Sequence, residues 1–406
     1  MITKFLSKLG PGILFAGAAI GVSHLVQSTR AGADYGWGLL WALFLAIIFK
    51  YPFFQFGPRY AIATQESLIE GYHKLGKPIL WLYFILNLAV MFTIQTAVTI
   101  VTAGIASEIF GITTNLGIWS AVILATCLCI LLFGRYKFLD KLMKVIILTL
   151  SICSILALGI AMGNEDASIG LGQVFPPQEG LLFLAAFMGW LPAPMDIAIW
   201  HSIWTLEKKK TKVDKLNLKE GLFDFNVGYW ATLLLGICFM GLGATVMFQS
   251  GVEFSNSGGV FASQLIALYT TNLGTAFYGI IGLAAFTTMF STTLTTLDAS
   301  PRVMSKIGEL LWKQKNEQYL GWILALCFGT LAIFFLFLSE MGLLVQIATV
   351  LSFLTAPIFA FLNYRLVTSS HMPKAAQPSK SMRWFSYLEI AFLSLFTIGY
   401  LISLTR

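Results

Sequence analysis

Charged side chains are scarce in this chain. Asp, Glu, Lys and Arg make up 11% of its 406 residues, whereas hydrophobic residues make up 57%. A typical soluble domain has about a quarter of its residues charged and close to half of them apolar. The composition therefore excludes an ordinary soluble protein and predicts an integral membrane protein.

Cysteine and histidine are also rare, with five and four residues. The cysteines, all inside predicted membrane spans, are Cys127, Cys129, Cys153, Cys238 and Cys327. We interpret them as small apolar packing residues, which argues against a disulfide framework and a zinc site. The sequence also lacks a His-rich metal motif, a phosphate-binding loop and a soluble catalytic domain, so we do not expect an enzyme or a bound cofactor.

Long hydrophobic runs are abundant, and most are close to the ~20 residues that cross a bilayer as a helix. The predicted spans are 12–29, 36–56, 78–106, 117–134, 144–163, 180–203, 225–248, 275–297, 319–338, 341–363 and 384–404. The sequence therefore predicts an all-α membrane protein with about 11 transmembrane helices.

The net charge of +7 comes from residues on one side of these spans. Of the 26 Lys and Arg residues, 23 lie in the N-terminal tail and in alternate loops, including the cluster 208–219 after the sixth span. This distribution predicts a cytoplasmic N-terminus in a plasma membrane, the inner membrane in a bacterium, and argues against a nucleic-acid partner. Lys50 lies within the second span, where we expect it to snorkel toward the cytoplasm.

Gly21, Val22, Ser23 and His24 interrupt the first span at its middle. Backbone groups freed at that depth must face protein or a polar cavity, because hydrocarbon offers them no partner. The sixth span has a matching interruption over 189–196, which contains two prolines. Two broken helices five spans apart predict a LeuT-type 5+5 inverted repeat, with a transport site at the breaks. The repeats would be 1–163 and 164–363, followed by a cytoplasmic loop and an eleventh span in 364–406.

The eighth span carries a dense hydroxyl cluster that includes Ser291 and Thr292. Bonding back to the preceding helical turn explains most such hydroxyls. In a LeuT-type fold they can also face the first break, where hydroxyl and carbonyl oxygens suit a hard cation. We keep Ser291 and Thr292 as candidates for an ion pathway.

Several motifs resemble the natural resistance-associated macrophage protein (NRAMP) family of proton-coupled divalent metal transporters. They are Gly10-Pro11-Gly12, Ala31-Gly32-Ala33, Leu39-Leu40-Trp41, Ala63-Thr64, Phe110-Gly111, His201-Ser202, Ser291-Thr292-Thr293, and Gln346 with Pro357. The resemblance covers most of the chain and implies the same fold. It also implies transport of a divalent metal.

The sequence departs from the family pattern at the positions that bind the metal. Gly21 and His24 stand where the family has its metal-binding Asp and Asn. In the sixth span, matching Pro194 to the family proline puts Ala193 at the Met ligand and Met195 at the His.

An alternative register of the sixth span puts Pro194 at the family Met and Asp196 at the His. In the third span the conserved acids fall on Gln95 and Val98, and the Gln of the tenth span falls on Thr355. The family site cannot operate unchanged, because a dehydrated divalent cation would face no carboxylate at the usual place.

Three residues could rebuild a metal site, namely His24, Met195 and Asp196. Their imidazole, thioether and carboxylate would converge from the two breaks. The alternatives are a neutral imidazole bonded to the open backbone of the sixth span, a packing methionine, and a carboxylate that caps the second half of the broken helix. Asp196 is the one acid that we expect near the centre of a span, where acids are usually functional. Glu389 is expected near an interface.

The substrate site would comprise Gly21, Val22, Ser23, His24, Trp190, Ala193, Met195, Asp196 and Thr355. Trp190 would form a wall or pack against helices. Asp196, Ser291 and Thr292 would serve an ion or proton pathway, and His201 would pass protons or stand as an interfacial histidine.

The favoured function is secondary transport of a divalent cation of the manganese, iron and magnesium class by alternating access. The alternative is a sodium- or proton-coupled transporter of a small organic solute, in which the Gly21 and Val22 carbonyls with the Ser291 and Thr292 hydroxyls hold sodium. The expected partners are the lipid bilayer and a small cation or solute, with the protein a monomer.

Overall fold

The computed structural model describes residues 9–133, 136–163, 170–211, 217–248, 263–267, 270, 274, 278–313, 318–336 and 341–403. Its main helices are, in chain order, α2 (Pro11–Ala19), the π-helix η1 (Val22–Ser28), α3 (Thr29–Tyr35), α4 (Leu40–Thr64), α5 (Leu68–Leu75), α6 (Lys77–Phe110), α7 (Leu116–Phe133), α8 (Tyr136–Met162), α9 (Leu181–Trp190), α10 (Ile197–Thr211), α11 (Leu218–Val246), α13 (Tyr278–Trp312), α14 (Tyr319–Leu336), α15 (Met341–Thr368) and α16 (Lys380–Ser403). Every predicted span coincides with one of these helices or with a broken pair, which confirms the helical membrane fold.

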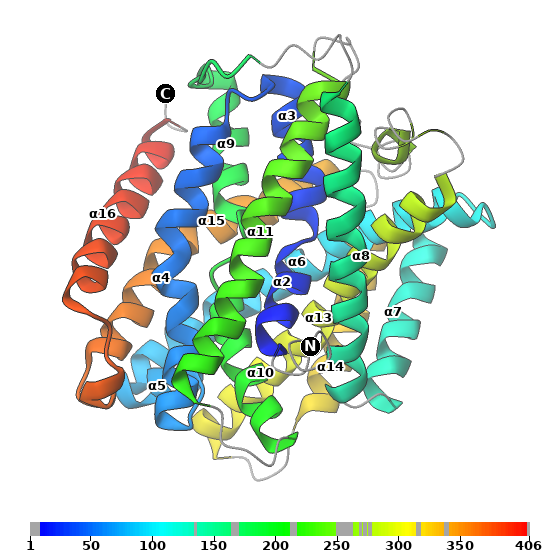
Figure 1. The fold of residues 1–406 in the computed structure, drawn as a ribbon. Coiled ribbons are helices and arrows are strands. Elements are labelled where there is room, and N and C mark those ends of the chain that lie inside the picture. The colour runs from blue at the N-terminus through cyan, green and yellow to red at the C-terminus, as the bar shows by residue number, and fades with distance from the viewer. Residues whose placement is uncertain are drawn as a thin grey trace.

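The first span is the centre of the bundle. Of its most apolar stretch 94% is buried, against 28% for α7, α14 and α16. Figure 1 shows α2 and α3 in dark blue among the other helices, and α16 in red at the edge. A helix that is apolar on all sides and surrounded by other helices belongs to the core.

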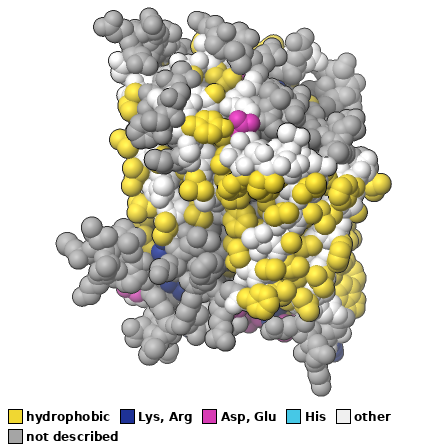
Figure 2. All heavy atoms as spheres, turned by 90° about the vertical axis from the view of Figure 1, so that its right-hand side faces the viewer, with side chains coloured by type: hydrophobic (Ala, Val, Ile, Leu, Met, Phe, Trp, Pro, Cys, Tyr) yellow, Lys and Arg dark blue, Asp and Glu magenta, His cyan; other side chains and the backbone are white. Residues whose placement is uncertain are grey.

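The peripheral helices turn apolar side chains outward. Ile118 and Phe133 of α7 and Leu148 and Leu156 of α8 are each more than half exposed. Figure 2 shows hydrophobic side chains spread over the face of the molecule that carries these helices. An exposed apolar surface of this extent suits contact with lipid. Within the described residues, nine helices are long and apolar enough to cross a membrane.

The first span breaks earlier than the sequence indicates. α2 ends at Ala19, Ile20 and Gly21 leave helical geometry, and the chain resumes as η1 at Val22. The amide groups of His24 and Leu25 already bond to the Gly21 carbonyl. Val22, Ser23 and His24, which we expected in the open segment, therefore belong to a wide helical turn.

The sixth span breaks where its sequence indicates. α9 ends at Trp190 and α10 begins at Ile197. Pro192 and Pro194 lie between them and have no backbone N–H to continue a helix. The two breaks lie against each other, because η1 contacts α9 and the Ser23 hydroxyl lies 3.3 Å from the Pro192 carbonyl oxygen.

A carboxylate from the seventh span fixes the start of α2. Gly10 has no side chain to cap that helix, and Pro11 occupies its first turn. Asp224 of α11 accepts hydrogen bonds from the backbone N–H groups of Gly10 at 2.8 Å and Gly12 at 2.9 Å. The carboxylate replaces a local cap and lies at the positive end of the helix dipole.

Candidate functional site

The broken helices enclose a cavity of about 20 Å³ at the middle of the bundle. Its lining includes Val22 and Ser23 of η1, Trp190 and Pro194 beside the second break, Val98 of α6 and Thr292 of α13. A cavity that holds one water needs about 10–15 Å³ of this volume. The cavity therefore has room for one water or one small ion.

Hydroxyl groups cover the end of α2 beside this cavity. Thr292 Oγ1 lies 3.1 Å from the carbonyl oxygen of Gly17 and 3.4 Å from that of Ile20. Ser23 Oγ lies 2.6 Å from the Ala19 carbonyl oxygen. These contacts join carbonyls freed at the first break to a hydroxyl of η1 and a hydroxyl of the eighth predicted span, where we expected oxygen ligands for a cation.

Ser291 differs from its neighbour Thr292. Its hydroxyl donates to the carbonyl oxygen of Thr288 at 2.7 Å, one turn back in α13. Thr355 of α15 bonds in the same way to Leu351 at 3.0 Å. Neither residue contributes to the cavity lining, so in this structure both have the ordinary role of a helical hydroxyl.

His24 is fully buried, and both of its ring nitrogens have partners within the protein. Nδ1 lies 2.6 Å from Ser23 Oγ, and Nε2 lies 3.0 Å from the carbonyl oxygen of Thr232 in α11. A metal would have to displace one of these contacts to bind the imidazole. The partner of Nε2 comes from the seventh span and not, as we expected for a structural histidine, from the sixth.

Asp196 lies at the start of α10, where its carbonyl oxygen accepts the N–H of Ile199 at 2.8 Å. Its side chain is 5% exposed, and Oδ1 has no hydrogen-bond partner among the described residues. The buried hydroxyl of Tyr83, in α6, lies within electrostatic reach of this carboxylate and also has no such partner. Asp196 therefore combines a position at a positive helix end with unused acceptor capacity.

The three predicted metal ligands do not meet around the cavity. Met195 is buried in the hydrophobic core, as is Ala193, and His24, Met195 and Asp196 are all absent from the cavity lining. Among the described residues, no three His, Cys, Asp or Glu side chains are grouped as metal ligands. The cavity is lined mainly by apolar side chains, and its polar side chains are the hydroxyls of Ser23, Thr292 and Thr296.

Trp190 and His201, two further predicted site residues, have well-defined contacts in the structure. Trp190 lines the cavity, and its Nε1 donates to Ser352 Oγ at 3.0 Å, so it forms a fixed wall. His201 is buried, and its ring lies 5.7 Å from that of Phe15 and 5.6 Å from that of Phe225. It lies inside the bundle, and neither ring nitrogen has a partner among the described residues.

Lys50 is a charged residue whose surroundings the sequence did not predict. It is 1% exposed and does not snorkel. Its Nζ donates to the carbonyl oxygens of Met188 at 2.8 Å, Gly189 at 2.6 Å and Leu191 at 2.8 Å, at the end of α9. The signal was available, because a lysine at mid-span needs acceptors and a broken helix supplies free carbonyls.

Glu389 is also buried, although the sequence suggested an interface. Its exposed fraction is 0%, and neither carboxyl oxygen has a hydrogen-bond partner among the described residues. Packing of α16 against α4 and α15 covers it. Glu389 is therefore a second buried acid within a predicted span, beside Asp196.

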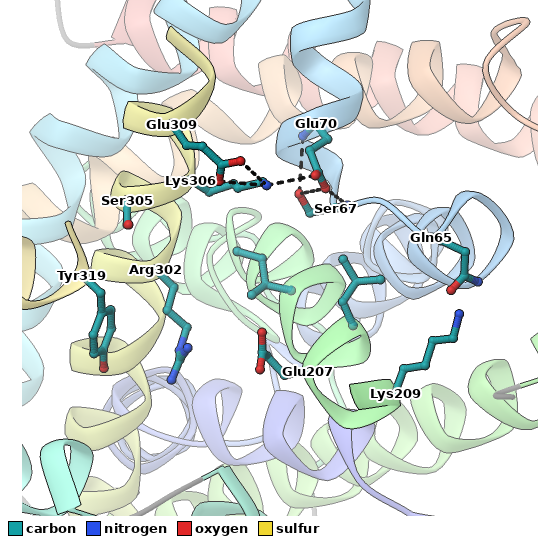
Figure 3. A pocket seen from close by; sticks show the side chains of 12 residues that line it. Gln65, Ser67, Glu70, Glu207, Lys209, Arg302, Ser305, Lys306, Glu309 and Tyr319 are labelled. Carbon is teal, nitrogen blue, oxygen red and sulfur yellow. Dashed lines mark hydrogen bonds and ion pairs between the residues drawn. The ribbon is translucent and has the colours of Figure 1, made fainter. Parts of the chain in front are cut away.

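A larger hollow of about 640 Å³ lies near the end of the bundle that carries most of the Lys and Arg residues. Figure 3 shows charged side chains around it, with Lys306 between Glu70 and Glu309. The Lys306 ammonium lies 3.0 Å from a carboxylate oxygen of each. We call this hollow the vestibule, and it lies at the end of the bundle that the distribution of positive charge predicts to be cytoplasmic.

Two broken helices that meet at a small central cavity are typical of the LeuT-type fold, and solved structures share this fold. A mutant manganese transporter of Eremococcus coleocola matches with a TM-score of 0.75 at 13% identity, over 97% of this chain and 85% of that one. The nucleobase-cation-symport transporter Mhp1 matches at 0.62 and 15%, over 97% and 90%. MhsT in complex with L-phenylalanine matches at 0.64 and 14%, over 95% and 98%.

The family model described as natural resistance-associated macrophage protein-like matches residues 12–403, and the chain belongs to this family. An uncharacterized protein of Pasteurella multocida is 35% identical over 98% of this chain and 92% of its own length. The divalent metal cation transporter MntH of Staphylococcus aureus is 24% identical over 62% of this chain and 57% of its own. The expected family and fold are confirmed, and the chain is a multi-pass transporter of the plasma membrane.

Proposed function

We propose that this protein moves a divalent metal cation of the manganese, iron and magnesium class through the central cavity by alternating access, without enzymatic activity. The cavity between the two breaks carries the proposal. It has room for a single ion and presents hydroxyl groups from Ser23 and Thr292. Membership of the family adds support, since relatives such as MntH are named as divalent metal cation transporters.

The volume of the cavity favours an ion over an organic solute. Small-molecule sites usually enclose about 300–1,000 Å³, whereas this cavity has about 20 Å³. An organic solute would need the helices around the breaks to separate first. A single cation fits the closed arrangement as it stands.

The ligand atoms favour a hard cation. Hydroxyl and carbonyl oxygens suit magnesium and manganese, whereas thioether sulphur favours softer metals. Met195, the one nearby thioether that we considered, does not line the cavity. We therefore expect manganese and magnesium to be carried better than softer ions.

Asp196 supplies the negative charge that the cavity lining lacks. Its buried Oδ1 has no partner in the described residues and lies beside the second break. A divalent cation that leaves water needs a nearby anion to offset its lost hydration. A modest movement of α10 would bring this carboxylate toward the cation or toward a coupled proton.

The test is ion uptake by the purified protein in sealed liposomes, with manganese and magnesium offered separately and internal pH recorded. Thr292→Val and Asp196→Asn should each lower manganese uptake at least about tenfold, as for loss of one ligand or one charge. Thr287→Val is the matched control, since Thr287 lies on the same helix and bonds back to Leu283 at 2.8 Å. It should transport normally.

The proposal fails if neither divalent ion enters faster than into empty liposomes while the protein is folded. Sodium-driven uptake of an organic solute under the same conditions would instead establish the alternative transport function. If metal enters without any change in internal pH, the transport is not coupled to protons.

A further inference from the structure

Lys50 lies near the middle of the membrane-spanning helix α4. It is the eleventh of the 25 residues of α4, which puts it roughly 15 Å from the start of that helix. Its side chain is fully enclosed by protein. A lysine at this depth is costly unless the surrounding structure provides acceptors for its protons.

The acceptors come from one place, the last turn of α9. The carbonyl oxygens of Met188, Gly189 and Leu191 lie 2.6–2.8 Å from Nζ. A neutral amine has two N–H groups and cannot donate to three carbonyls, so this arrangement calls for the ammonium form. The negative end of the α9 dipole points at the same atom and favours its charge.

Unwound carbonyls at half-helix ends bind sodium ions or protons in other transporters with broken helices. We propose that the carbonyls of Met188, Gly189 and Leu191 form a monovalent-cation site that Lys50 fills with its own ammonium. The second break then keeps its shape without an inorganic ion. Lys50 is a positioning residue, because it acts through the backbone beside the central cavity and does not line that cavity.

This inference does not depend on which substrate the protein carries. It predicts that removing the side chain creates a cation site that a small molecule can fill. Lys50→Ala keeps Cβ and removes three carbons and the nitrogen, which together correspond to n-propylammonium. That ion should restore the variant by binding to the folded form.

The first experiment measures Tm of purified Lys50→Ala in detergent with chloride salts of methyl-, ethyl-, n-propyl- and n-butylammonium, and with sodium and potassium. We expect a lower Tm than in the native protein and a saturable recovery that is greatest with n-propylammonium. Lys74→Ala is the matched control, since Lys74 forms a partly exposed ion pair with Glu66. Its Tm should not respond to the alkylammonium series.

Two further measurements distinguish loss of the ammonium group from general misfolding of the variant. Lys50→Met keeps an unbranched side chain that is one atom shorter than lysine and has no charge, so it should lose stability and show no saturable recovery. The native protein, which fills its own site, should have the same Tm and the same ion uptake in sodium, potassium or choline chloride.

Three results would overturn the inference. One is a Lys50→Met variant with native Tm and native uptake. Another is an equal response of the Lys50→Ala and Lys74→Ala variants to n-propylammonium. The third is a specific, saturable increase of the native Tm with sodium that the Lys50→Ala variant lacks. That result would mean that sodium binds at this site while Lys50 is present, so Lys50 would not be filling the site by itself.

Discussion

Arg302 binds both carboxylate oxygens of Asp298, with its Nε 2.8 Å from Oδ1 and 2.9 Å from Oδ2. The same carboxylate accepts the Tyr319 hydroxyl at 2.9 Å and Trp204 Nε1 at 3.4 Å. Arg302 and Tyr319 line the vestibule, and the buried Asp298 lies on the bundle side of them. This cluster joins α10, α13 and α14 between the vestibule and the cavity.

Removing the charge of Asp298 should weaken this cluster and destabilise the protein. Asp298→Asn leaves the Arg302 guanidinium without its carboxylate and weakens two further hydrogen bonds. We expect a loss of about 1–3 kcal/mol in the free energy of unfolding, less than for a fully buried pair because the Arg302 side chain is 33% exposed.

Chemical denaturation in detergent measures this change. Asp34→Asn is the comparison, since the Arg30–Asp34 pair is 41% and 34% exposed. The exposed pair should contribute no more than about 0.5 kcal/mol. Equal effects of the two variants would contradict a structural role for the buried cluster.

Gly21 is required at the first break because Thr292 occupies the space beside it. A Cβ built on Gly21 would lie 2.6 Å from Thr292 Oγ1 and 2.8 Å from its Cγ2. Gly21→Ala should therefore destabilise the protein by about 1–3 kcal/mol. A Thr292→Ala background removes the two nearest atoms and leaves only Cβ of residue 292, 3.1 Å away, so the cost should fall by about 0.5–3 kcal/mol.

A double-mutant cycle of unfolding free energies measures this coupling. Gly159→Ala is the control, because nothing lies within 4 Å of a Cβ at that position in α8. It should be neutral or stabilise the helix by up to about 1 kcal/mol. Strict additivity of the Gly21 and Thr292 changes would show that the contact does not constrain the break.

The sequence predicted the fold well because its signals are local. Pro192 and Pro194 cannot continue a helix. Gly21 lies in the first break, just after α2 ends at Ala19. The location of positive charge also predicts the orientation by a rule that needs no tertiary contact, and the orientation stays a prediction. The division into repeats at residue 163 also remains a prediction.

The candidate site was harder to predict because its contacts join distant spans. Both nitrogens of His24 are occupied, one by a carbonyl 208 residues away, and no spacing rule reveals such a partner. Lys50 looked like a snorkelling lysine, but its acceptors lie 138–141 residues further along the chain. The burial of Glu389 was not predicted, because hydropathy does not show which face of α16 packs against the bundle.

Asp224 should be needed to hold the start of the first span. It accepts two backbone N–H groups at the beginning of α2, and bonds to a charged acceptor contribute about 1.5–3 kcal/mol each. We expect Asp224→Ala to lower the free energy of unfolding by at least about 2 kcal/mol. Asn217→Ala, which removes an ordinary cap from α11, should cost about 1 kcal/mol. A smaller loss for Asp224→Ala than for Asn217→Ala would contradict this role.

The surroundings of Glu70 in the short helix α5 predict how the stability of the folded protein depends on pH. Partial burial raises the pKa of Glu70, but bonds from the Ser67 backbone N–H and the Lys306 ammonium outweigh it and hold the pKa below the ordinary value of 4.5. A carboxylate with a depressed pKa in the folded state stabilises the protein above its unfolded pKa. That contribution is lost as pH falls through the folded value.

The measurement is Tm of the native protein and of Glu70→Gln in detergent between about pH 3 and pH 7, a range that covers the titration. The native Tm should exceed that of the variant by a constant amount above about pH 5.5, and the difference should shrink below the unfolded pKa of 4.5. Glu309→Gln is the control, because Glu309 contacts the same ammonium with a side chain that is 57% exposed. A native advantage that grows as the pH falls would have the wrong sign for a depressed pKa and would refute this account of the Glu70 contacts.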